Sequence, residues 1–245
     1  EEVNKDFVDF MLDLQKHLLI RMYSTGYERI FKVLLTKAGV PVFEGFKVEN
    51  TYVKYNENLK PDLNRITADY NCTCYYNLNG SAYWKPEITG ENDASNLEYY
   101  LTAGTNKINP TLTIKVNKTN RIIVSNILAD SQKIQKATLS PFRQMYASFE
   151  RDCLGANSIY LIGYKFKDTL INEILTYIRK NLPKVSIYMI DSHFDENDKM
   201  IQFLMKWNAG KNYNYLMNIK TDDYGNSGDY KVTVYKKSFA EYLAM

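Results

Sequence analysis

The sequence is poor in the residues that crosslink a chain or bind metal ions. It contains three cysteines and two histidines among 245 residues. Cys72 and Cys74 form a C-x-C pair and Cys153 lies far from both, so the spacing fits neither a disulfide framework nor a four-ligand zinc site. We therefore expect no metal cofactor, and we expect the protein to work in reducing surroundings.

The sequence also lacks an excess of charge of one sign and lacks long apolar runs. Its 31 basic and 28 acidic residues leave a net charge of +3. Without a long basic run, nucleic acid is not predicted as a partner. No stretch reaches the roughly 18 to 20 uncharged apolar residues of a membrane span, and no signal peptide pattern opens the sequence. We therefore expect no membrane partner and a soluble protein of the cytoplasm.

What the sequence does have is a strand, turn and helix pattern around residue 163. Residues 158–162 form a short apolar run that Gly163 closes. Asp168 then stands where a helix N-cap would, and Arg179 and Lys180 stand near the C-terminal end, where cations suit the helix dipole. The apolar positions between them follow helical spacing at i, i+3, i+4 and i+7, which predicts a buried stripe. These positions are Ile171, Ile174, Leu175 and Ile178.

The same alternation runs along much of the chain. Gly39 is a fitting end for a helix whose inward face would hold Ile30, Val33, Leu34 and Ala38. Alternating strands and helices favour an α/β fold, here a Rossmann-like, mostly parallel sheet with helices on both faces. We expect a single domain over 1–245 with a loop-rich insertion at about 46–120. Helices are predicted at 4–19, 26–40, 140–156 and 195–208, strands at 18–25, 71–84, 184–194 and 212–219, a loop with a short helix at 90–110, and a closing strand and helix within 229–243.

The expected fold predicts where a ligand would bind. In such sheets, ligands lie beyond the carboxyl ends of the strands, here the corners after Thr25, Ile162 and Ile190. The sequence has no G-x-G-x-x-G run before the helix at 26–40, so the usual dinucleotide fingerprint is missing from it.

Three of these corners together resemble the sirtuin-like, NAD-consuming domains that are common in prokaryotic anti-phage defence. "SIYLIGYKFKDTLINEIL" is similar to the family's strand, its Gly-Tyr-Ser-Phe turn, its Asp and its Ile-Asn-x-Ile-Leu helix. In the following "VSIYMID", Asp191 stands where the family places an acid or amide near the adenosine ribose. "YSTGYERIF" resembles the family's Thr-Thr-Asn-Tyr-Asp turn, and "YYNLNGSAYW" resembles its Lys-Leu-His-Gly-Ser corner with a nearby Trp.

The resemblance implies a sirtuin-like fold and a ligand such as NAD or an ADP-ribose-like nucleotide. It also implies that residues from all three corners line one crevice. The positions that match the family's cofactor-binding motifs are Ser24, Thr25, Gly26, Glu28, Asn79, Gly163, Tyr164 and Asp191.

The sequence departs from the family where the chemistry takes place. The family's catalytic Asn and His correspond to Gly26 and Asn79. Glycine has no side chain to orient a ribose or a water molecule, and a neutral amide does not accept a proton near pH 7, as imidazole does. No catalytic residue is therefore assigned, and His193 is the candidate substitute base. The family's Ser after Gly-Tyr is replaced by Lys165.

Three functions follow as hypotheses. The first is a sirtuin-like domain that no longer hydrolyses NAD and acts as a nucleotide-binding, regulatory or scaffold component of a bacterial defence-type system. The second is an active NAD glycohydrolase of anti-phage defence with a rearranged or incompletely represented site. The third is an interaction module whose Tyr- and Asn-rich ranges, 46–70 and 90–120, bind a partner protein, with a homo-oligomer as another candidate assembly. Ordinary packing of tyrosines on half-buried strands is the alternative to that third hypothesis.

Overall fold

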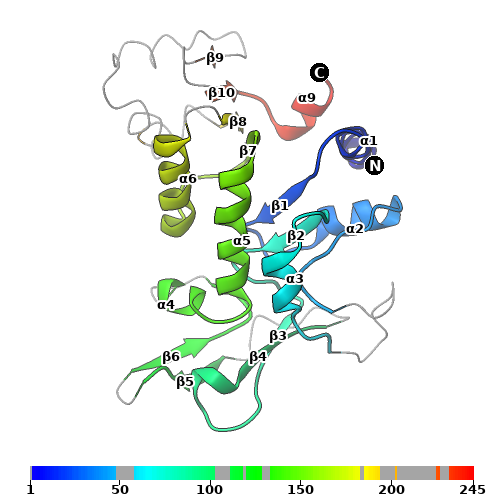
Figure 1. Ribbon diagram of the computed structural model, residues 1–245. Helices are drawn as coiled ribbons and strands as arrows, with labels where there is room; N and C mark the ends of the chain where they lie inside the picture. The colour runs from blue at the N-terminus through cyan, green and yellow to red at the C-terminus, as the bar shows by residue number, and fades with distance from the viewer. Residues whose placement is uncertain are drawn as a thin grey trace. The chain divides into compact units, whose positions relative to one another are not determined.

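Figure 1 shows the computed structural model as a ribbon. By its contacts the chain divides into two compact units. The first unit comprises 1–10 and 150–245, and the second unit comprises 11–149. The fold is mixed α/β, and the described strands form four small sheets, some parallel and some antiparallel. The structure describes residues 2–47, 58–102, 111–117, 120–128, 133–182, 185–193, 202, 225–226 and 232–245.

The sheet of the first unit is mostly parallel. Its strand order is β7 (Ser158–Ile162), β8 (Ser186–Ile190), β10 (Val232–Tyr235) and β9 (Gly225–Asn226). β7 and β10 both pair in parallel with β8, and β9 is antiparallel to β10. β7 and β8 end in register, so the segments that follow them leave the sheet at the same edge. This confirms the strands predicted at 158–162 and 184–194 and the closing strand predicted within 229–243.

Helix α6 (Thr169–Asn181) confirms the pattern seen in the sequence. Asp168 is its N-cap, and the Asp168 carboxylate accepts a hydrogen bond of 3.4 Å from the backbone N–H of Ile171. Ile171, Leu175 and Ile178 are buried. The predicted apolar stripe is therefore the inner face of this helix.

Aromatic contacts join the two ends of the chain within the first unit. α1 (Glu2–Gln15) begins there, and the ring of Phe7 lies 6.2 Å from that of Phe239 in α9 (Phe239–Leu243). Phe10 contacts Tyr242 at the same centroid distance of 6.2 Å. Edge-to-face pairs of this kind add to the stabilisation from apolar burial. The start of the amphipathic helix α1 thus packs against the last helix.

The second unit begins with a short parallel pair. β1 (Arg21–Ser24) pairs with β2 (Cys74–Asn77), and Ser24 lies opposite Asn77 at the end of both strands. The polar residues that follow the two strands are therefore delivered to one corner. α2 (Ile30–Lys37) follows the first of them, and Gly39 ends that helix with the positive φ of 82° that the sequence predicts.

The inward face predicted for α2 is wrong for three of its four residues. Ile30 and Val33 are 53% and 40% exposed, and Ala38 is exposed as well. Leu35 is instead the buried residue of this helix. The helix is short, so two overlapping apolar stripes satisfy helical spacing equally, and spacing alone does not choose between them.

The range 46–120 contains regular structure. It holds α3 (Leu63–Ala68), the antiparallel pair β3 (Trp84–Ile88) and β4 (Leu97–Leu101), and β5 (Leu112–Lys115). β5 pairs in antiparallel fashion with β6 (Arg121–Val124), which follows this range directly. A single 3-10 turn, η1 (Ala94–Asn96), stands where a short helix was expected. The remaining helices of the described ranges are α4 (Lys133–Ala137) and α5 (Phe142–Gly155), the second of which confirms the helix predicted at 140–156.

An aromatic cluster forms the core of the second unit. Trp84 is 2% exposed, and its ring lies 5.2 Å from Phe46 and 5.3 Å from Phe142. Tyr99 from β4 completes the cluster, 5.1 Å from Phe142. The corner after β2 is thus anchored, through Trp84, to the most deeply buried part of this unit.

Some predictions fall outside the described residues. These are the helix at 195–208, apart from residue 202, and the strand at 212–219. Within the described ranges, no helix combines the length and the apolar character that crossing a bilayer requires.

Candidate functional site

The turn after β1 is fixed by hydrogen bonds from its own start and from the neighbouring strand. Ser24 Oγ accepts a hydrogen bond of 3.0 Å from the backbone N–H of Gly26. Asn77, 3% exposed at the end of β2, donates through Nδ2 to the carbonyls of Gly26 and Glu28, at 3.0 Å each. One buried amide therefore sets the path of the backbone through the predicted binding turn.

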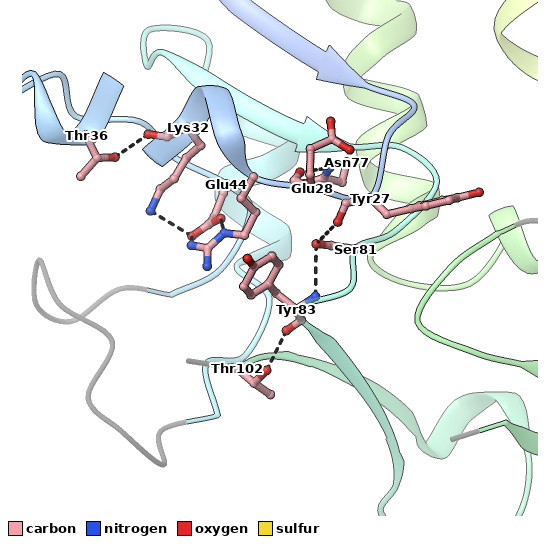
Figure 2. A network of polar contacts seen from close by, with 10 residues as sticks. Tyr27, Glu28, Lys32, Thr36, Glu44, Asn77, Ser81, Tyr83 and Thr102 are labelled. Carbon is pink, nitrogen blue, oxygen red and sulfur yellow. Dashed lines mark hydrogen bonds and ion pairs between the residues drawn. The ribbon is translucent and has the colours of Figure 1, made fainter. Parts of the chain in front are cut away.

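Ser81 provides a second set of bonds to the same turn (Figure 2). Its hydroxyl donates to the carbonyl of Tyr27 at 2.9 Å, and the N–H of Ala82 donates to that carbonyl at 3.0 Å. The N–H of Tyr83 donates to Ser81 Oγ at 3.3 Å. The turn after β1 and the corner after β2 are thus held together as one structural piece, which we call the strand-end corner (residues 24–29 and 77–83).

Asn79 is built into this corner as a crosslink. Its side chain donates from Nδ2 to the carbonyl of Thr25 at 3.3 Å and accepts at Oδ1 from the hydroxyl of Tyr146 at 3.2 Å. Its carbonyl accepts from the N–H of Leu128 at 2.8 Å, and the residue is only 7% exposed. Both ends of the amide are therefore engaged with the protein.

Gly26 is packed directly against Glu28. A Cβ atom placed on Gly26 would come closest to the carboxylate oxygens of Glu28, nearer than real Cβ contacts allow. Any larger residue at position 26 would force the Glu28 side chain to move. Gly26 and Glu28 are therefore coupled, since the carboxylate occupies the space that a side chain at position 26 would need.

Gly80 lies where two backbone segments approach each other closely. It has a φ of +84° and forms an isolated bridge with Ile127. A Cβ atom there would run into the carbonyl of Asn126 and would lie 3.0 Å from the Cα of Ile127. Both the positive φ and the contact require glycine at this position.

The buried side chain of Glu44 forms ion pairs with Arg29, the last residue of the turn after β1, and with Lys32. Arg29 Nε donates to Glu44 Oε2 at 2.7 Å, and Lys32 Nζ lies 3.3 Å from Glu44 Oε1. The Glu44 side chain is 5% exposed. The Arg29 guanidinium also stacks over the ring of Tyr83 at 5.1 Å, so it joins Glu44 to the Ser81 side of the corner.

The tyrosines beside the corner are poor proton acceptors. Burial raises the pKa of Tyr75 to about 12, and burial also raises the pKa of Tyr76 above its ordinary value. Both hydroxyls therefore keep their protons at neutral pH.

The loop after β7 forms the candidate site of the first unit. Gly163 and Phe166 have positive φ values of 59° and 53°. Tyr164 donates its hydroxyl proton to Asn172 Oδ1 at 2.7 Å, and Asn172 Nδ2 donates to the carbonyl of Phe166 at 2.9 Å. Burial raises the pKa of Tyr164 above its ordinary value, so its hydroxyl remains a donor. α6 thereby holds the loop in an otherwise unfavourable backbone conformation.

Asp191 lies at the end of β8 and contacts this loop. Its side chain is 4% exposed, and Oδ2 lies 2.6 Å from Lys165 Nζ. Oδ1 accepts a hydrogen bond of 2.9 Å from the N–H of His193. We call Lys165 together with Asp191, Ser192 and His193 the sheet-edge cluster.

His193 is the exposed member of the sheet-edge cluster. Its side chain is 65% exposed, with Nδ1 at 3.0 Å from Ser192 Oγ and 3.9 Å from Asp191 Oδ1. A role as substitute base stays a prediction.

The structure brings the predicted site residues together in two groups. The convergence of both groups on one crevice stays a prediction. Ser24, Thr25, Gly26, Glu28 and Asn79 lie in the strand-end corner of the second unit, and Gly163, Tyr164, Asp191 and His193 lie around the sheet edge of the first.

Sequence reasoning missed the residues that hold the corner in place. Asn77, Arg29 and Glu44 are three of them. A polar residue at the end of an apolar strand is the sequence signal for Asn77, whereas no local pattern indicates that Arg29 pairs with Glu44. A separate open hollow beside η1, lined by Asp93, Ser95 and Lys115 among others, contains none of the predicted residues.

The described residues contain no group of metal-binding side chains, and comparisons with known proteins give no match. Over the part of the chain that is described, no three His, Cys, Asp or Glu side chains are grouped so that they could hold a metal ion. The sequence matches no model of a known protein family, and a comparison with curated proteins gives no match.

Proposed function

We propose that this chain is a sirtuin-like domain that has lost NAD hydrolysis and serves as a nucleotide-binding, regulatory or scaffold component of a bacterial defence-type system. The proposal rests on the resemblance of three sequence corners to that family. The observation that carries the loss of activity is the engagement of Asn79 at both ends of its side chain.

General base catalysis needs a group that can take a proton near neutral pH and reach the reacting atoms. At position 79 the amide has no basic lone pair, and Thr25 and Tyr146 already occupy its hydrogen-bonding atoms. At position 26 there is no side chain, and Glu28 fills the adjacent space. Neither position of the family's catalytic pair offers a proton acceptor or a ribose-orienting group.

Retention of motif residues in the corner supports the scaffold part of the proposal. Ser81 and Gly80, which match the family motif, still shape the backbone around Asn79. Both residues hold the fold of the corner, so the backbone keeps its path although the catalytic groups are absent. The proposal is therefore that the scaffold persists and the reaction does not.

The test is to incubate the purified protein with NAD and to measure nicotinamide and ADP-ribose by chromatography, with calorimetric titration of NAD and ADP-ribose in parallel. We expect binding without turnover. Turnover that is abolished by Asn79→Ala, but kept by the exposed matched variant Asn64→Ala, would overturn the proposal. Turnover that depends on His193 instead would favour an active glycohydrolase with a rearranged site.

A further inference from the structure

The sheet-edge cluster lies where a nucleotide ribose would be recognised in an α/β sheet. Asp191 directly follows β8, and Lys165 lies two residues after Gly163, which follows β7. Ile162 and Ile190 are register partners, so both segments leave the sheet side by side. In doubly wound folds, an acid beyond a strand end accepts hydrogen bonds from a free ribose hydroxyl, whereas a nearby basic residue accommodates a ribose phosphate.

The carboxylate of Asp191 is already engaged. One oxygen faces the ammonium group of Lys165 at 2.6 Å, and the other accepts from the backbone N–H of His193 at 2.9 Å. With 4% of its side chain exposed, Asp191 has little surface to offer a ligand. A ribose diol would have to displace Lys165, which would leave a buried charge without its counter-ion.

Lys165 is the group that the cluster does offer. Its side chain is 42% exposed, and a lysine ammonium has three N–H donors, of which the contact with Asp191 uses one. Ser192 and His193 next to it are exposed and carry further groups that donate hydrogen bonds to phosphate oxygens. The backbone beneath Lys165 is fixed by the bonds of Tyr164 and Asn172.

We propose that the Lys165–Asp191 pair makes this sheet edge selective for a nucleotide that carries a phosphomonoester on its ribose, over the same nucleotide with a free diol. This inference rests on the proposed nucleotide-binding function and names its ligand class. Lys165 is the specificity-determining residue, because it both blocks the carboxylate and supplies the charge.

The test compares ADP-ribose with 2′-phospho-ADP-ribose by calorimetric titration of the full chain. We expect the wild type to bind the phosphorylated probe about tenfold more tightly, the size of effect that one charge-assisted hydrogen bond provides. Lys165→Ser should reverse this order, since it removes the phosphate contact and frees Asp191 for the diol. Lys167→Ser, which removes an exposed charge from the same loop, should leave the preference unchanged.

Lys165→Arg is the control that separates loss of the charge from loss of the folded structure. It keeps the charge and should keep the preference for the phosphorylated probe, and circular dichroism checks that each variant is folded. Equal affinities of the wild type for both probes, or an equal loss of both in Lys165→Ser, would refute the inference while leaving nucleotide binding in place. Binding of neither probe would overturn the proposed function and this inference with it.

Discussion

The strand-end corner of the second unit and the sheet-edge cluster of the first unit both follow the ends of parallel strands, yet they use their polar side chains in opposite ways. In the corner, Asn77 and Asn79 are buried and point their hydrogen bonds at the protein's own backbone. At the sheet edge, Lys165 and His193 keep 42% and 65% of their side chains exposed.

This difference indicates that the sheet edge, and not the corner, has an exposed cationic side chain that a ligand can contact. The corner is a structural joint whose polar atoms are engaged, and the sheet edge is a loop that presents exposed polar side chains. If this contrast is right, changes in the corner should act on stability, and changes of exposed charge at the sheet edge should act on binding. Two predictions test the stabilising role of the contacts to the corner, and a third tests the helix that holds the sheet-edge loop.

The largest effect is expected from Glu44→Gln. The change removes the buried counter-ion of Arg29 and Lys32, whose side chains are 11% and 18% exposed, and breaking a largely buried pair in this way costs about 3 kcal/mol of unfolding free energy. Urea unfolding followed by circular dichroism measures the loss. The matched change Asp13→Asn breaks the exposed pair with Lys16, whose side chains are 73% and 65% exposed, and should cost under about 0.5 kcal/mol. Equal losses for the two variants would contradict the bracing role of Glu44.

A smaller loss is expected from Tyr146→Phe. It removes the buried hydrogen bond to Asn79 Oδ1 and leaves that oxygen unpaired, which costs about 2 kcal/mol. The exposed Tyr177 provides the matched control, because Tyr177→Phe removes a hydroxyl from a residue with 52% exposure and should leave stability unchanged. If Tyr146→Phe were as stable as the wild type, Asn79 would not be a crosslink, and a role for it in catalysis would regain support.

The smallest of the three losses is expected from Asp168→Ala. The change removes the N-cap of α6 and should cost about 1 kcal/mol. Thr169→Ala, one residue further along and exposed, should have almost no effect. In addition, Asp168→Ala should weaken nucleotide binding, because α6 holds the loop that presents Lys165. Unchanged binding in a destabilised variant would show that the loop does not depend on its helix.

Local pattern was sufficient to predict the parts of the fold that depend on neighbouring residues. The apolar stripe of α6 and its Asp168 cap both depend on residues that lie within about a dozen positions of one another, and both are confirmed. The parallel strand ends at Ser24 and Ile162 follow from the same local reading.

The parts that escaped prediction depend on partners far apart along the chain. Asn77 bonds to carbonyls 51 and 49 positions away, and no spacing rule reports such a contact. β4 was read as loop because Asn and Gly dominate its flanks, although Leu97, Tyr99 and Leu101 alternate with a period of two and are buried. The overlapping stripes of α2 likewise needed tertiary contacts to decide between them.

The in-register pairing of β1 with β2 limits how this chain can change its length over evolution. A single inserted residue in either strand would turn its side chains to the opposite face and would move Ser24 away from Asn77. Insertions and deletions should therefore accumulate in surface turns such as the one around η1, while the count of residues from Arg21 to Gly26 and from Cys74 to Ser81 stays constant among descendants of this gene.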